Sequence, residues 1–114
     1  MGHYTKLAIF KDCYELTKDV LTKVNKIDKR YRYTLGDDIR RTLFAMLHLI
    51  NEVNTSDSKI PVLNKFLLYY ERLKLDLQLC IDMHIFSPKI LSTSFPLLKS
   101  VGEQARKWKQ SCLR

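Results

Sequence analysis

The chain has 114 residues, 46% of them hydrophobic, which predicts one domain, residues 1–114, with a single core. No apolar run reaches the roughly 18 residues that a membrane-spanning helix needs, so we expect a soluble, cytoplasmic protein with no membrane partner. The formal charge is +8, and the surplus lies near the two ends, because residues 1–36 and 87–114 hold 14 of the 20 cations and 5 of the 12 acids.

The three cysteines are Cys13, Cys80 and Cys112, and they form no C-x-x-C pair and have no histidine at ligand spacing. An odd count of this kind argues against a disulfide framework and against a zinc site. We therefore expect buried free thiols.

The first predicted helix runs from Lys6 to about Ile27. Its apolar and aromatic positions recur at steps of three and four, which is the spacing of one helical face. That predicted face consists of Phe10, Cys13, Tyr14, Thr17, Val20, Leu21, Val24 and Ile27.

The second predicted helix begins at Leu35, because Thr34 and Asp37 form a Thr-x-x-Asp capping pattern. The apolar face runs through Ile39, Leu43, Met46, Leu47, Ile50 and Val53 to a loop at Asn54. Phe44 and Leu49 lie off this stripe and predict a second contact surface.

The third predicted helix extends from about Pro61 to Phe86. Its seam reads Leu63, Phe66, Tyr70, Leu73, Leu77, Cys80 or Ile81, and His84. A second apolar stripe, formed by Leu68, Leu75 and Leu79, follows a different side of the same helix. Together with Phe44 and Leu49, this stripe is the expected oligomer interface.

Ser87 and Pro88 form an N-cap and first-position pair for a fourth helix, which continues through Trp108 to Cys112. Pro96 disfavours an uninterrupted helix, so we expect either a kink between Ser92 and Pro96 or a helix that begins only at Ser94. No stretch alternates as a half-buried strand does. The fold class that follows is all-α, an elongated antiparallel up-and-down four-helix bundle.

No pattern in the chain indicates catalysis, a metal or another cofactor. Phosphate-binding glycine loops, nucleophile elbows and Glu-x-x-His pairs are absent from the sequence, and His3, His48 and His84 are isolated from one another. We predict a protein that is not an enzyme and that acts by binding.

Two basic clusters are candidate binding sites. The first is KRYRYTLGDDIRRT, residues 29 to 42, where rings alternate with cations in a manner suited to bases and phosphates. An alternative is that its tyrosines close one end of the bundle while its cations stay in water. The second is the run around Trp108, where solubility and the helix dipole are the alternative explanation. The candidate residues are Lys29, Arg30, Arg32, Arg40, Arg41, Arg106, Lys107 and Lys109.

In an up-and-down bundle these clusters fall at opposite ends, unless assembly of several subunits brings them together. If they lie on one side, their fields add into a patch that attracts phosphate with strong salt dependence.

YRYTLGDDIRRTLFAMLHLINEVN resembles the second helix of the accessory variability determinant (Avd) proteins of diversity-generating retroelements. FKDCYELTKDVLTKV, LLYYERLKLDLQLCIDMHIFSPKIL and VGEQARKW are similar to further parts of that family, so the resemblance covers nearly the whole chain. Pro96 and the scarcity of acids in STSFPLLKS depart from the family pattern.

The resemblance implies a four-helix bundle that assembles into a pentameric barrel. It also implies a basic surface that binds RNA or DNA and the retroelement's reverse transcriptase during mutagenic retrohoming. The residues it implicates are Arg30, Arg32, Arg40, Arg41, Arg106 and Lys107. Two alternatives stay open: a bundle of the type encoded by intervening sequences of ribosomal RNA genes, and a helical assembly module that binds no nucleic acid.

Overall fold

Four long helices follow the apolar periodicities of the sequence: α1 (Gly2–Val24), α3 (Leu35–Val53), α4 (Lys59–Asp82) and α5 (Ser94–Cys112). Two short elements connect them, the helix α2 (Lys29–Arg32) and the 3-10 helix η1 (Ile90–Ser92). The computed structural model describes residues 2–113, and side chains from residue 8 onward. Within that range 81% of the chain is helical and no strand occurs, which confirms the all-α class.

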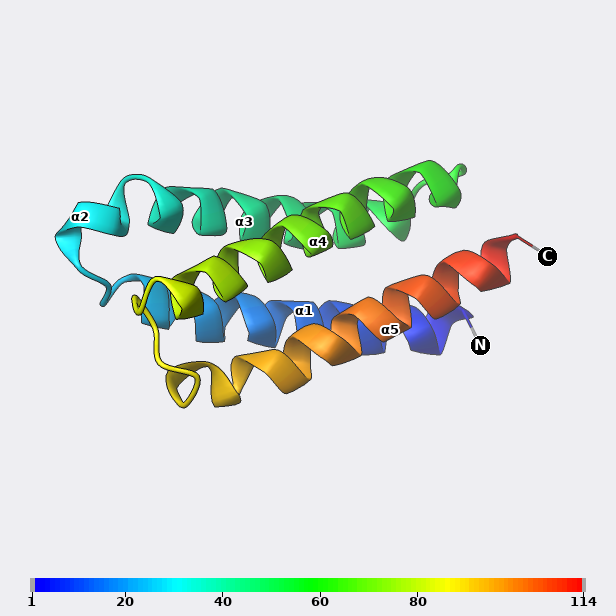
Figure 1. The fold of residues 1–114 in the computed structure, drawn as a ribbon. Coiled ribbons are helices and arrows are strands. Elements are labelled where there is room, and N and C mark those ends of the chain that lie inside the picture. Colours follow the sequence, from blue (N-terminus) through cyan, green and yellow to red (C-terminus); the bar gives the residue numbers. More distant parts are fainter. Residues whose placement is uncertain (1, 114) are drawn as a thin grey trace.

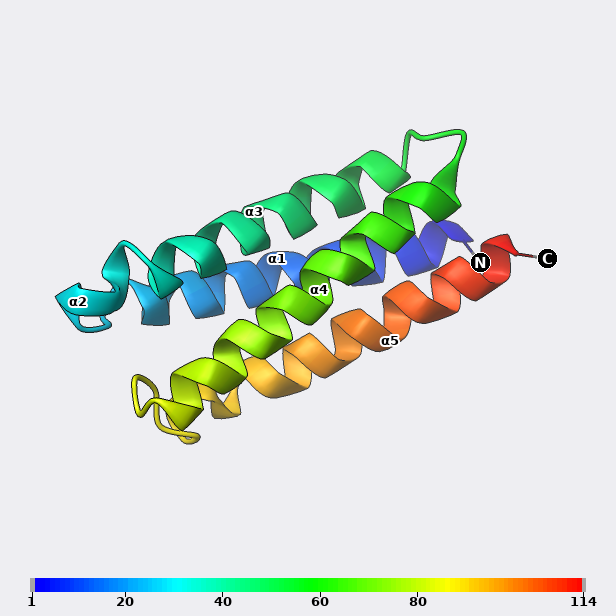
Figure 2. The ribbon, with the colours of Figure 1, turned by 45° about the horizontal axis from the view of Figure 1, so that its top comes forward.

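Each long helix packs against two others. α1 contacts α3 and α5, and α4 contacts the same two helices from the other side (Figures 1 and 2). The molecule measures 45 × 23 × 19 Å and is elongated along the helices, as expected. The connection through α2 and the connection from α4 to α5 lie at one end, and the two chain termini lie at the other.

The core face of α1 differs in part from the predicted face. Tyr14 is 46% exposed, and Phe10 and Leu21 are half-buried. Ile9 and Leu16, which the prediction omitted, are fully buried. The buried row continues through Cys13, Thr17, Val20, Val24 and Ile27. Steps of three and four fit two adjacent rows of this helix, and contact with α3 and α5 selects the row that contains Ile9 and Leu16.

Cys13 and Cys80 are free and buried, as predicted, and Cys112 is free and half-buried. Burial raises the pKa of the Cys13 thiol to about 12 and that of Cys80 to about 11, which keeps both protonated at neutral pH.

Helix α3 begins at Leu35 as predicted, but the capping bond is absent. The Thr34 hydroxyl donates to the carbonyl oxygen of Tyr31 at 3.4 Å instead of accepting from the first turn of α3. Gly36 allows α3 to start close to α1, because a Cβ there would lie 3.2 Å from Cδ1 of Ile27 and 3.3 Å from the Tyr31 carbonyl oxygen.

The end of α4 corrects the prediction that this helix runs to Phe86. The helix ends at Asp82, and His84 has a φ of 58°, in the left-handed region. The amide groups of Ile85 and Phe86 turn back to the carbonyl oxygen of Cys80, at 2.8 and 3.1 Å. His84 is therefore a helix-terminating residue that is exposed, not a member of the apolar seam.

Of the two expectations for the last helix, the start at Ser94 is the one observed. Pro96 falls in the first turn, where its missing N–H has no intrahelical partner to lose. Asp19 of α1 fixes this start by accepting hydrogen bonds from Ser94 at 2.6 Å and from Lys23 at 2.9 Å. Burial opposes the charged form of Asp19, but the hydrogen bonds from Ser94, Lys23 and Thr93 outweigh burial and lower its pKa.

Candidate nucleic-acid interface and assembly surface

Asp28 organises the first basic cluster. Its carboxylate caps α2 by accepting from the backbone N–H of Arg30 at 2.9 Å, and it binds the Arg30 guanidinium through Nε and Nη2, both at 3.1 Å. The side-chain hydrogen bond from Arg30 is the main reason why the pKa of Asp28 is lowered. The Arg30 guanidinium also lies 5.4 Å from the centre of the Tyr31 ring. Arg30 is exposed, but its charge is shared with Asp28.

Arg32 and Arg40 hold the turn that joins α2 to α3. Arg40 donates to the carbonyl oxygen of Arg32 at 3.2 Å and to Asp37 at 2.5 Å. Arg32 is half-buried and donates to the carbonyl oxygen of Ile27 at 3.5 Å, while its Nε has no hydrogen-bond partner among the described residues. Both guanidinium groups are thus engaged with the chain itself.

Lysines provide the free charge at this end. Lys29 is exposed, and so is Lys26 at the end of α1, which sequence reasoning did not select as a site residue. Lys26 lines a hollow of about 410 Å³ together with Ile85 and Ile90 of the α4–α5 connection. The same connection contains the exposed Lys89, which therefore lies at this end of the molecule. None of these three lysines has an ion pair within residues 8–113. We call Lys26, Lys29 and Lys89 the lysine end.

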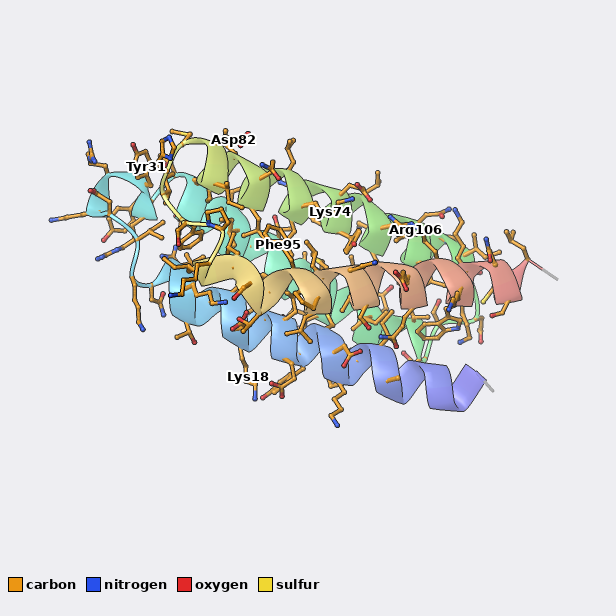
Figure 3. All side chains as sticks on the ribbon, turned by 60° about the horizontal axis from the view of Figure 1, so that its bottom comes forward. Lys18, Tyr31, Lys74, Asp82, Phe95 and Arg106 are labelled. Atoms are coloured by element: carbon orange, nitrogen blue, oxygen red, sulfur yellow. The ribbon has the colours of Figure 1, made fainter. Side chains whose placement is uncertain are left out.

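The two tyrosines of the first cluster have different environments. Tyr31 is half-buried and packs against the core (Figure 3). Tyr33, by contrast, is 70% exposed. Arg41, one turn into α3, is also exposed. Tyr33 is therefore the more exposed ring of the first cluster.

The second basic cluster lies at the opposite end of the molecule, as the up-and-down arrangement predicts. Arg106 binds Glu71 of α4 at 3.1 Å, and its guanidinium lies 5.5 Å from the centre of the Tyr70 ring. Lys107 is exposed and Lys109 is half-buried. The structure does not bring the two clusters together within one copy of the chain.

The second apolar stripe of α4 faces solvent. Leu68 is 72% exposed, Leu75 69% and Leu79 42%. Contiguous apolar exposure of this kind on one face commonly marks an interaction surface. We call these three residues the leucine row.

Phe44 and Leu49 do not extend the leucine row. Phe44 is 46% exposed on α3, but Leu49 is only 9% exposed and belongs to the core. The prediction that Leu49 lies off the core stripe is wrong, because the buried face of α3 includes Leu49 beside Met46 and Ile50.

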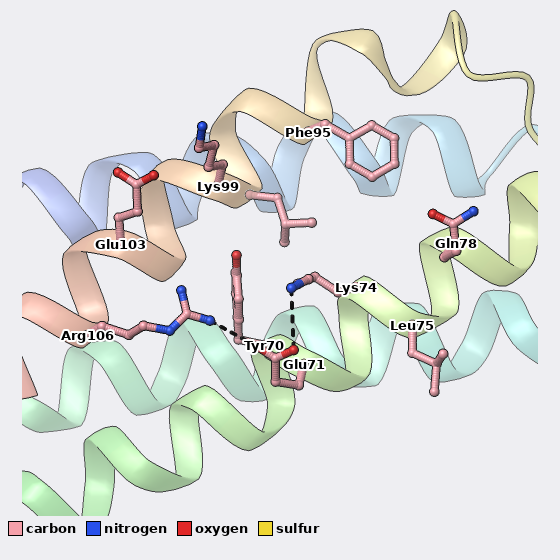
Figure 4. A pocket seen from close by; sticks show the side chains of 10 residues that line it. Tyr70, Glu71, Lys74, Leu75, Gln78, Phe95, Lys99, Glu103 and Arg106 are labelled. Carbon is pink, nitrogen blue, oxygen red and sulfur yellow. Dashed lines mark hydrogen bonds and ion pairs between the residues drawn. The ribbon is translucent and has the colours of Figure 1, made fainter.

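A groove between α4 and α5 was not apparent from the sequence. It has a volume of about 690 Å³, and Tyr70, Leu75, Phe95 and Leu98 form its apolar part (Figure 4). Tyr70 is 3% exposed, and burial raises the pKa of its hydroxyl. We call this feature the α4–α5 groove.

A carboxyl pair between α3 and α4 was also missed. Asp38 binds both Nε and Nη2 of Arg72, and its pKa is lowered chiefly by that interaction. The half-buried Asp76 lies beside Asp38, and its Oδ2 atom is buried without a hydrogen-bond partner among the described residues. Burial, and then the neighbouring Asp38, raise the pKa of Asp76 to about 7.

No described group of three or more His, Cys, Asp or Glu side chains is arranged to hold a metal ion. Within the described part of the chain, no helix has the length and hydropathy needed to cross a membrane. Comparison with known protein families, curated proteins and solved structures finds no match to this chain.

Proposed function

We propose that this chain is a non-catalytic accessory protein of the Avd type, which binds RNA or cDNA and docks a reverse transcriptase. In this proposal the four long helices form an antiparallel up-and-down bundle, and copies assemble through the leucine row into a pentameric barrel. The resemblance carried by the sequence suggests the class. The observation that carries the binding role is the lysine end, where three exposed lysines from two connections have no ion pair among the described residues.

Binding at the lysine end has a measurable signature. Each phosphate contact releases counterions, so log Kobs falls with log salt by about 0.7 per contact on single strands and about 0.9 on duplex DNA. We expect titrations with single-stranded RNA and duplex DNA over a salt series to give a slope of about −2 to −3. An affinity that does not change with salt would contradict the proposal.

A charge-matched pair of variants locates the site. Lys26→Glu with Lys29→Glu should weaken binding and flatten the salt slope. The control, Lys11→Glu with Lys65→Glu, changes the net charge equally at exposed positions away from the lysine end. If both variants lose equal affinity, net charge alone explains binding and the lysine end is not the site.

Assembly is tested separately. Leu75→Glu should lower the mass measured by sedimentation, because it places a charge in the leucine row. Leu113→Glu is the control, since Leu113 is 64% exposed and lies at the end of α5, outside the leucine row. Unchanged mass for Leu75→Glu would remove the leucine row as the subunit contact.

The second candidate function is a helical assembly module without nucleic-acid binding. It is favoured by the internal engagement of Arg30, Arg40 and Arg106, each of which is paired with an acid of the same chain. Charge reversal at Lys107 and Arg106 without loss of partner binding supports this candidate. Loss of nucleic-acid binding in the same variant excludes this candidate and places the site at the Arg106 end instead of the lysine end.

A further inference from the structure

The α4–α5 groove shares Leu75 with the leucine row, but its other lining residues belong neither to that row nor to the lysine end. The Tyr70 ring forms part of its floor, and the hydroxyl end of that ring packs against α5 at Gly102, where an added Cβ would stand 2.8 Å from Cε2. Leu98 completes the floor and is 3% exposed, while the half-buried Phe95 and the exposed Leu75 form the sides. The groove therefore has an apolar interior open along its length.

The length of the groove matches a short helix. On α4 the lining spans residues 70–78, and on α5 it spans residues 95–106. At 1.5 Å per residue these spans are about 12 and about 17 Å. Two to three turns of an added helix fit this length, with apolar side chains at i, i+3 or i+4, and i+7 directed into the groove.

The rim of the groove selects the charge of that helix. Lys74 and Arg106 share Glu71, at 3.5 and 3.1 Å, and both lie over the Tyr70 ring. Lys99 stands exposed on the α5 rim with no ion pair within residues 8–113. The rim thus has one more cation than acid, in a chain with a net charge of +8. The cations are Lys74, Lys99 and Arg106, and the acids are Glu71 and Glu103. The apolar interior and the engaged state of Lys74 and Arg106 do not suit a nucleic-acid backbone.

We propose that the α4–α5 groove is a docking site for an amphipathic helix of a partner protein, with apolar anchors on one face and acidic residues along its edges. The anchors enter between Leu75 and Phe95. The acids pair with Lys99 and with the outer faces of Lys74 and Arg106. This site does not depend on the binding of nucleic acid at the lysine end, so each can fail without the other.

A pair of synthetic helical peptides tests the proposal with the full chain. The first is a fluorescein-labelled 16-residue helix with leucines at i, i+4, i+7 and i+11 and glutamates on both edges. The second has lysines in place of the glutamates. We expect fluorescence anisotropy to show binding of the acidic peptide, and binding of the basic peptide at least about tenfold weaker.

Three variants, checked for helical content by circular dichroism, assign the site. Phe95→Glu should weaken binding of the acidic peptide by about tenfold or more, and Lys99→Glu should weaken it by several-fold. Lys99 is exposed, so its variant keeps the test valid if Phe95→Glu does not fold. Leu68→Glu, in the leucine row but outside the groove, should leave peptide affinity unchanged.

Several outcomes would overturn this inference. They are equal binding of the two peptides, binding of neither, or no effect of Phe95→Glu and Lys99→Glu. A loss of peptide affinity in Leu68→Glu would assign the peptide to the leucine row instead. Displacement of the peptide by single-stranded RNA makes the groove a nucleic-acid site. A change in the sedimentation mass of Phe95→Glu makes it a contact between copies.

Discussion

Asp76 gives this protein a stability that depends on pH in an unusual direction. Its pKa is raised from 3.8 to about 7, so the folded state binds a proton on Asp76 more tightly than the unfolded state does. The resulting stability is fully present below pH 3.8 and is lost as pH rises through about 7. The lowered pKa of Asp38 acts in the opposite sense, but only as pH falls below 3.8. The two effects therefore occupy separate pH ranges.

The perturbation that isolates this effect is Asp76→Asn. If the site were fully shielded from solvent, raising the pKa of Asp76 from 3.8 to about 7 would correspond to about 4 kcal/mol, because one pKa unit is worth about 1.36 kcal/mol. Asp76 is only half-buried, and solvent screening reduces the expected effect to on the order of 1–2 kcal/mol. We expect Asp76→Asn to raise the free energy of unfolding by that amount at pH 8 and by only about a third of it at pH 5, because at pH 5 the carboxyl is ionised in the unfolded state but still carries its proton in the folded state.

Urea unfolding followed by circular dichroism at pH 5, 6.5 and 8 measures this difference. Comparison of variant with wild type at each pH cancels the contributions that all other groups make to the free energy of unfolding. The control is Asp82→Asn, which removes the same charge from an exposed position on the same helix. A destabilised Asp76→Asn at pH 8, or the same gain at pH 5 as at pH 8, would refute the reasoning.

Gly102→Ala should destabilise the fold by about 1–3 kcal/mol, measured by urea unfolding, because the new Cβ collides with the Tyr70 ring. His84→Gly should stabilise the fold by about 0.5–1 kcal/mol and raise Tm by several degrees, since glycine adopts a φ of 58° without the cost that a side chain incurs. Asp19→Ala should cost about 1–3 kcal/mol, because it leaves the buried Ser94 hydroxyl and Lys23 without their shared acceptor. An unchanged Tm for any of the three would contradict the packing described for that residue.

Local sequence signals predicted the helices well where one residue type restricts the backbone. Ser94 as the first residue of α5 follows from the position of Pro96. Leu35 is the first residue of α3 as predicted, although Thr34 does not make the capping bond on which that prediction rested. The predicted end of α4 at Phe86 failed because His84, in a left-handed conformation, replaces the glycine that usually marks a helix end. The apolar periodicity of the sequence continues past His84, although the backbone leaves the helical conformation there.

Contacts between helices were harder to predict. The burial of Leu49 and the exposure of Tyr14 depend on which neighbouring helix covers each side, and a single-helix pattern contains no such information. The Asp38–Asp76 pair joins residues 38 positions apart. Its only signal in the sequence was an acid at position 76, next to the buried seam residue Leu77. The exposed row of Leu68, Leu75 and Leu79 was predictable because it repeats along one helix.

The distribution of ion pairs limits what a nucleic-acid site on this protein can recognise. Acids at the α2 end are bonded to arginines, Asp28 to Arg30, Asp37 to Arg40 and Asp38 to Arg72. The guanidinium groups of Arg30, Arg40 and Arg72, whose forked donors could read base edges, are therefore occupied, and the lysines together with the exposed Arg41 provide the remaining charge. An ammonium group interacts with phosphate as a point charge and carries little base preference. Binding at the lysine end should then be independent of nucleic-acid sequence and strongly reduced by salt. A marked preference for one base composition would instead point to base contacts from the exposed Arg41, or from Arg30 after it leaves Asp28.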